Sequence, residues 1–244
     1  NGGQNLTFKG DAYLTNGIVD GGPSGGSHGT LIIGGNIVAS TNLVLTNTPN
    51  ITMNPTSKTN TVSGSGLDGI GNFIKDGTSD SEVILNGPIT ASGVYINQGT
   101  LLLGANNYIR GAPSLNLAGG TFHSGGYSNT FGILTLTANS IINFGAGTNS
   151  FLTFANSSSL TNWTAGVNLT LIGWSGLTSG GGTEGSRVGT DSTGLTSNQV
   201  AQIRFLDPAG LPGGTYGATI LANGEVKPVP EINTIIAVLL LALL

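Results

Sequence analysis

The sequence predicts an all-β fold made of many short strands. Three observations carry this prediction: short apolar segments alternate with Gly, Asn and Ser, 42 of the 244 residues are Gly, and helix-period stretches are almost absent before residue 195. Only 7% of the residues are charged and none is Cys, so backbone ladders and packed aliphatics must supply the stability. With 38% hydrophobic residues, the chain is too apolar for a disordered linker.

Segments of four or five residues rich in Val, Ile, Leu and Thr are the expected strands. Several of them alternate apolar residues with Thr or Asn, which turns one face toward a core and the other toward water. The Gly and Asn residues that separate these segments tolerate the positive φ of tight corners. The expected strands include Thr30–Ile33, Asn42–Thr46, Glu82–Leu85, Gly93–Ile96, Thr100–Leu103, Ser114–Leu117, Ile133–Thr137, Ser140–Phe144, Phe151–Phe154 and Asn168–Ile172.

A solenoid and a β-sandwich both fit this pattern, and one motif favours the solenoid. Gly71-Asn-Phe-Ile-Lys-Asp-Gly77, Val83-Ile-Leu-Asn-Gly87 and Gly99-Thr-Leu-Leu-Leu-Gly-Ala-Asn-Asn107 follow one another, with an echo at Leu115–Phe122. This succession resembles the autotransporter-associated β-strand repeat of bacterial extracellular proteins. The resemblance implies a right-handed parallel β-helix, and the sandwich remains the alternative.

Stacked coils would also explain the many Asn and Thr residues, whose side chains would bond one coil away along the axis. If a coil takes roughly 20 to 25 residues, the first 170 residues make about seven or eight coils. The even composition of this part shows no linker, which indicates one extended architecture.

The pattern changes after Gly173. Residues Thr178 to Gly194 indicate an irregular loop, and Thr196 and Ser197 can cap a short helix from about Asn198 to Arg204. A short helix and a hairpin would cover the exposed edge at the end of a solenoid. We therefore divide the chain into a β-solenoid at 1–172, a cap with a short helix at 173–227 and an apolar tail at 228–244.

The order of residues toward the C-terminus resembles that of bacterial PEP-CTERM sorting-domain proteins. It runs from Gly173-Trp174-Ser175-Gly176 through Gly224-Glu225-Val226-Lys227 to Pro230-Glu231 and an apolar run, with Ile232 in place of the second Pro of the motif. The resemblance implies export and a place at the cell surface or in an extracellular matrix. Asn1-Gly2-Gly3-Gln4 lacks the basic and apolar regions of a signal peptide, so an exported form would be the mature one.

The apolar run of ten residues is about half of what a bilayer-spanning helix needs. An apolar segment of this kind is typical of an interface, so we expect it to pack with other copies of the chain; a membrane anchor is the alternative. The expected assembly residues are Ile235, Ile236, Val238, Leu239, Leu240, Leu241, Leu243 and Leu244.

Charge and composition exclude several function classes. The net charge of −4 and seven scattered basic residues argue against nucleic-acid binding. The absence of Cys excludes thiolate metal sites and cysteine catalysis. We expect no cofactor and no enzyme, because no nucleophile elbow, phosphate-binding loop or catalytic triad is present.

Few residues are candidates for chemistry. Asp76, Asp80 and Glu82 form the one local concentration of carboxylates, suited to a calcium site or to acid catalysis on a polysaccharide, but a polar turn is the simpler interpretation. His28 and His123 are two ligands at most, whereas a metal site needs three or four.

Trp163, Trp174 and Tyr216 could stack on a sugar or pack inside the cap. The sequence therefore predicts a structural subunit of a bacterial extracellular or cell-surface filament or biofilm matrix, which assembles through solenoid ends and its tail. Its partners would be copies of itself and, as a second candidate, extracellular polysaccharide. The alternative is a membrane-anchored adhesin or glycan-binding module, and a polysaccharide-degrading enzyme using Asp80 or Glu82 comes third.

Overall fold

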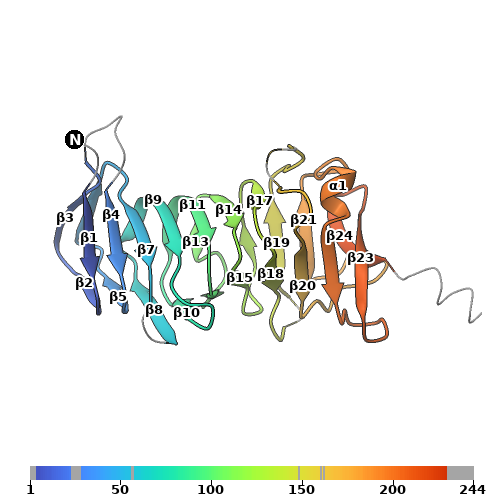
Figure 1. The fold of residues 1–244 in the computed structure, drawn as a ribbon, viewed down its shortest axis with the longest axis horizontal. Helices are drawn as coiled ribbons and strands as arrows, with labels where there is room; N and C mark the ends of the chain where they lie inside the picture. The colour runs from blue at the N-terminus through green and yellow to red at the C-terminus, as the bar shows by residue number, and fades with distance from the viewer. Residues whose placement is uncertain are drawn as a thin grey trace, which may run out of the picture.

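The chain forms a parallel β-solenoid of about 6 turns, drawn out into a rod (Figure 1). The computed structural model describes residues 4–22, 29–55, 58–147, 149–159, 161 and 163–229. About 48% of the chain is strand and 2% is helix. The solenoid prediction is confirmed and the sandwich alternative is wrong, because strands of consecutive coils pair in parallel with each other rather than as antiparallel hairpins.

Strands of successive coils line up on the faces of the rod. One face is a sheet in the order β1 (Asn5–Phe8), β4 (Thr30–Ile33), β7 (Asn50–Met53), β9 (Leu67–Lys75), β11 (Ile89–Ile96), β14 (Ser114–Leu117) and β17 (Leu134–Leu136), with β13 (Ile109–Arg110) also paired to β11. A second face runs through β2 (Ala12–Leu14), β5 (Ile37–Ala39), β8 (Thr59–Gly64), β10 (Glu82–Leu85), β12 (Thr100–Leu103), β15 (Thr121–His123), β18 (Ser140–Asn143), β20 (Leu169–Ile172) and β22 (Ile203–Leu206).

A third face begins with β3 (Gly17–Asp20) and β6 (Leu43–Thr46). Toward the other end of the rod it consists of β16 (Asn129–Thr130), β19 (Phe151–Phe154) and β21 (Gly185–Val188). Between them, β11 pairs with β13 at its start and with β14 at its end, so one long strand serves two faces.

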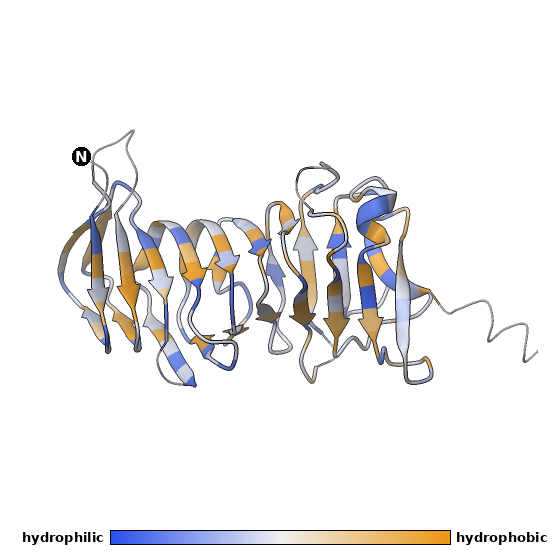
Figure 2. Ribbon diagram, in the orientation of Figure 1, coloured by the Kyte–Doolittle hydropathy of each residue, from blue (hydrophilic) through white to orange (hydrophobic). Residues whose placement is uncertain are grey.

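Apolar and polar residues alternate along many of the strands (Figure 2), and the buried apolar side chains fill the inside of the coils. On the first face, Leu31 pairs with Ile51, Ile51 with Phe73 and Phe73 with Val94, and all four are buried. The same stacking on the second face aligns Val83, Leu101, Phe122, Ile142, Leu171 and Phe205. Each fully buried aliphatic or Phe side chain contributes roughly 1.5–3 kcal/mol, so these interior columns are the main source of stability.

Polar side chains bridge neighbouring coils at the corners. Asn36 Oδ1 accepts from the backbone N–H of Thr61 at 2.7 Å, and Asn50 Oδ1 accepts from that of Asn72 at 2.9 Å. The buried Asn129 bonds to both backbone groups of Ile109 in the preceding coil. The expected bonds between coils are present, but their partners are mostly backbone groups rather than equivalent side chains, because each corner leaves a backbone group outside the ladder.

The length of a coil varies along the rod. In the middle of the rod, Val94 and its partner Leu115 lie 21 positions apart, within the expected coil length. The coils are longer near both ends, where Asn5 pairs with Thr30 and Leu169 with Ile203. The parallel ladder also continues beyond residue 172, through β21 and β22.

The helix α1 (Ser197–Val200) is shorter than the expected helix, which was to run to Arg204. Thr196 and Gln199 form a capping box, in which each side chain bonds to the backbone N–H of the other residue. Ile203 and Phe205 lie on strand β22 instead, because their apolar side chains continue the interior column of the second face.

Replacing Thr196 by Ala is expected to lower the free energy of unfolding by about 1 kcal/mol, since the N–H of Gln199 loses its acceptor. Denaturant titration measures this loss. The exposed Ser192→Ala is the control and should stay within about 0.5 kcal/mol of the parent. Equal values for the two variants would mean that the capping box contributes nothing to the stability of the cap.

Candidate functional site

The C-terminal end of the rod is closed by a β-hairpin. Strand β23 (Thr215–Ile220) pairs antiparallel with β22, and β24 (Glu225–Val229) pairs antiparallel with both β23 and β21. The hairpin thereby joins the last strand of the second face to the last strand of the third face (Figure 1). Neither of these two faces ends in an unpaired strand here.

Charged side chains hold a loop against the outside of this hairpin. Glu225 Oε2 accepts from the N–H of Gly181 at 2.8 Å, and Lys227 Nζ donates to the carbonyl of Thr178 at 2.6 Å. Glu184 accepts from the N–H of Ser175, and burial raises the pKa of its carboxyl. The loop is therefore held on the hairpin by specific hydrogen bonds to charged side chains.

The large aromatic residues of this region are structural. Trp174 is buried and meets the ring of Phe205 edge-on at 5.5 Å between centroids. Trp163 is also buried, and its Nε1 donates to the carbonyl of Leu134 at 3.1 Å. The sugar-stacking platform is therefore wrong as an interpretation of the two Trp residues, which pack inside the end of the rod, and Tyr216 donates to the carbonyl of Pro212.

The N-terminal end of the rod, in contrast, presents three strand edges. Within the described residues, β1 has β4 as its one hydrogen-bonded neighbour, β2 has β5 and β3 has β6. The outer backbone groups of a strand at a sheet edge are available to another strand. We call this ring of three strands, Asn5–Phe8, Ala12–Leu14 and Gly17–Asp20, the open end.

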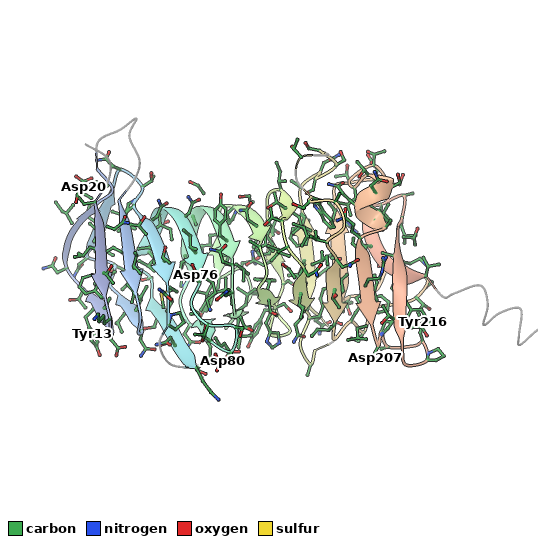
Figure 3. All side chains as sticks on the ribbon, viewed as in Figure 1. Tyr13, Asp20, Asp76, Asp80, Asp207 and Tyr216 are labelled. Carbon is green, nitrogen blue, oxygen red and sulfur yellow. The ribbon has the colours of Figure 1, made fainter. Side chains whose placement is uncertain are left out.

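The open end exposes one large apolar side chain on each strand. Leu6 is 56% exposed, Tyr13 70% and Ile18 71%. Leu6 aligns with the buried Leu31 in the interior column of the first face, and it is exposed within the described residues. Figure 3 shows Tyr13 and Asp20 at this end of the rod, with Asp207 and Tyr216 at the other.

A pocket of about 280 Å³ lies at the open end, between β1 and β3. Leu6, Ile18, Val19, Leu31 and Pro49 give it an apolar lining. These three strands were not among those expected from the sequence. The alternation of Leu6 with Phe8, followed by Tyr13, is the signal that would have found them.

Two of the carboxylates that the sequence brought together, Asp76 and Asp80, bond to residues of their own turn. Asp76 accepts from the N–H of Gly77, and Asp80 accepts from the hydroxyl of Thr78, which lowers the pKa of Asp80. Glu82 lies on the outside of β10. Among the described residues, no group of three or more His, Asp or Glu is placed to hold a metal ion. This favours the polar-turn interpretation.

The structure describes one of the two histidines. His123 lies on β15, where burial lowers its pKa. His28 is outside the described residues.

One charged side chain occupies an interior position. Lys75 pairs with Met53 on one side and Ile96 on the other, in a column that is otherwise apolar, and its side chain is fully buried. Its Nζ donates to the carbonyls of Asp76 and Gln98 at 2.7 and 2.9 Å and to the hydroxyl of Ser81 at 2.8 Å. The Ser81 hydroxyl in turn donates to the carbonyl of Thr78.

All three protons of the Lys75 ammonium group are thus used, and Ser81 is buried with its own proton engaged. A Ser–Lys pair can act as a nucleophile and base, but this pair has no access for a substrate. Its role is to satisfy the backbone groups of the corner after β9 from the inside of the coil.

Stability is expected to rise with pH because of Lys75. Burial lowers the pKa of Lys75 from 10.5 to about 8, and the charge of Asp76 acts in the opposite direction. Between pH 8 and 10.5 the unfolded chain therefore binds more protons at this site than the folded chain, so the free energy of unfolding rises with pH by at most about 3 kcal/mol.

Denaturant titrations at pH 7.5 and 10, on the parent and on Lys75→Met, measure this contribution. The rise should be absent in the variant, which is also less stable at both pH values because three buried acceptors lose their donor. Identical pH dependence in both proteins would contradict the assignment.

The remaining sequence predictions concern the C-terminal tail. Pro230, Glu231 and the apolar residues from Ile235 to Leu244 lie outside the described residues. Within the described part, no helix has the length and apolar character to cross a bilayer.

Comparisons with family models, curated proteins and solved structures gave no match. The class of the protein therefore follows from its own architecture, which is that of a parallel β-solenoid closed by a hairpin at its C-terminal end.

Proposed function

We propose that the protein is a structural subunit of a bacterial extracellular or cell-surface filament or matrix, with no catalytic role. The rod of stacked parallel coils carries this proposal, together with the exposed apolar side chains of Tyr13 and Ile18. A rigid rod of this kind is suited to assembly.

The two ends would contribute differently to assembly. Stacking of the open end on the C-terminal end of the next subunit is disfavoured, because the hairpin β23–β24 already pairs with β21 and β22 there. The apolar residues from Ile235 to Leu244 would instead bring C-terminal ends together; burying each aliphatic is worth roughly 1.5–3 kcal/mol.

Negative-stain electron microscopy of the full chain and of a chain ending at Glu231 tests the proposal. Filaments or ordered aggregates of rods are expected from the full chain, and short particles from the shorter one. If both chains remain single rods and the longer one partitions into detergent, the tail is an anchor and the structural role is wrong.

A glycan-binding module is the second candidate, supported by a groove on the side of the rod. This groove of about 350 Å³ crosses β15, β18 and β20 and the turns before them, and it is lined by Gly119, Gly120, Thr121, Asn139, Ser140, Asn168 and Thr170 together with the apolar Ile141. Titration calorimetry with neutral polysaccharide would show binding that Thr121→Val with Thr170→Val weakens.

A further inference from the structure

We infer that the groove across β15, β18 and β20 binds an uncharged polysaccharide whose chain runs along the axis of the rod, so that its sugars follow the coils. The inference rests on the glycan-binding candidate of the proposed function. It names the chemistry of the sugar, the direction of its chain and the side chains that hold it.

The groove repeats one position in three successive coils. Thr121, Ile141 and Thr170 are register partners on the outside of β15, β18 and β20, so their side chains stand in one line across the strands. All three are half-buried. Neighbouring strands lie about 4.8 Å apart, which is close to the length of one pyranose ring, and the line therefore spans about 10 Å.

Hydroxyl and amide groups along this line are available to a ligand. Within the part of the chain that the structure describes, no hydrogen bond engages the hydroxyls of Thr121 and Thr170 or the side-chain amide of Asn168. The buried Ser140 differs, because its hydroxyl donates to a backbone carbonyl and accepts from the N–H of Gly119, both at 2.9 Å. The line thus offers a hydroxyl, an apolar side chain and a second hydroxyl, which suits the hydroxyl and C–H groups of a sugar.

The lining disfavours other classes of ligand. None of the described residues that line the groove is charged or aromatic, so a nucleic acid would find no cation for its phosphates. A peptide strand would need an unpaired edge, whereas β15, β18 and β20 each pair with a neighbour on both sides. An uncharged sugar chain needs neither a cation nor a strand edge.

Charged side chains lie beyond both ends of the line. Arg204 follows Thr170 in the same column, and its Nη1 already donates to two backbone carbonyls. On the other side Thr100 precedes Thr121, and Glu82 precedes Thr100. The carboxylate of Glu82 would repel an anionic sugar. Thr100 is half-buried and extends the uncharged line by one coil, so about four sugars fit between the charged residues.

Titration calorimetry with neutral oligosaccharides of glucose, N-acetylglucosamine and mannose, from the monosaccharide to the hexasaccharide, tests the arrangement. For the sugar that binds, affinity should rise with chain length and level off at about four units. Thr100→Val should move this plateau to a shorter chain and weaken binding of the tetrasaccharide about three- to tenfold, the effect of one lost hydrogen bond.

Thr52→Val is the matched control. Thr52 is a half-buried, outward-facing residue on β7 of the first face, so its replacement should leave the affinity unchanged. Circular dichroism of both variants should match that of the parent, because Val keeps the shape and the β-propensity of Thr.

Other results would overturn the inference in distinguishable ways. An affinity that is the same at every chain length, or that Thr100→Val and Thr170→Val leave unchanged, would keep the glycan-binding candidate and reject this groove and chain direction. Tighter binding of oligogalacturonate than of every neutral oligosaccharide would reject the uncharged ligand. Absence of binding by any of these sugars would reject both the inference and the glycan-binding candidate.

Discussion

Replacing Gly64 by Ala is expected to destabilise the solenoid by more than about 4 kcal/mol or to prevent its N-terminal coils from forming. Gly64 ends β8 with φ +86°, and a Cβ there would lie 1.7 Å from the carbonyl oxygen of Ala39 in the preceding coil. The obstacle is backbone, so no side-chain rotation can relieve it.

The strain would pass from coil to coil. Gly87 stands above Gly64 in the same corner, and a Cβ at Gly87 would lie 1.9 Å from the carbonyl oxygen of Gly64. A shift of residue 64 that avoids Ala39 therefore has no free space to enter. Solenoid stability depends on contacts between neighbouring coils, so a misfit at one corner weakens both adjoining interfaces.

Gly69→Ala is the matched control for this variant. Gly69 has φ +89°, almost the same as Gly64, but a Cβ at this position would meet nothing within 4 Å. Its cost should be the backbone strain alone, about 1–2 kcal/mol. Denaturant titration, with hydrogen exchange on the first coils, measures the loss of unfolding free energy in both variants. Equal losses would mean that the corner at Gly64 is not closely packed.

The strands were predictable from the sequence wherever alternation was strong. The expected bounds Thr30–Ile33, Thr100–Leu103, Ser114–Leu117 and Phe151–Phe154 agree with those of β4, β12, β14 and β19. Each has apolar side chains at alternate positions facing the interior column, and that burial determines the strand in the sequence and in the structure alike.

The continuation of strands around corners was less predictable. The sequence indicated Gly93–Ile96, whereas β11 begins at Ile89 and changes register between Thr90 and Ala91. Which residue meets which in the next coil depends on coil length, and local propensity does not encode it. The burial of Lys75 was hidden for the same reason, because its three acceptors come from the following turn and from the next coil.

The candidate site consists of strand edges that have no second hydrogen-bonded neighbour within the described residues. Within the described residues, β1, β2 and β3 each pair on one side, whereas the hairpin β23–β24 pairs with the last strands of the second and third faces. A sequence pattern identifies strands but not which of them lie at an edge. Only the strand order shows that Leu6, Tyr13 and Ile18 lie on edge strands.

Replacing Phe131 by Ala should cost about 3–5 kcal/mol. Phe131 is buried between two other rings, meeting Phe122 edge-on at 5.3 Å and stacking on Phe154 at 5.4 Å between centroids. Phe122 belongs to the second face and Phe154 to the third, so the cavity left by Ala would separate two faces of the rod.

The same cavity should change how the solenoid unfolds. Coils are coupled through their interfaces, and a weak interface in the middle of the rod allows the two halves to unfold separately. A broadened or two-step denaturant transition is therefore expected for Phe131→Ala. Phe131→Leu should lose less and keep one transition, because it refills much of the volume, and the half-exposed Ile133→Ala two residues away should lose little. A single sharp transition in Phe131→Ala, with a loss no larger than that of Ile133→Ala, would mean that the aromatic stack does not couple the halves of the rod.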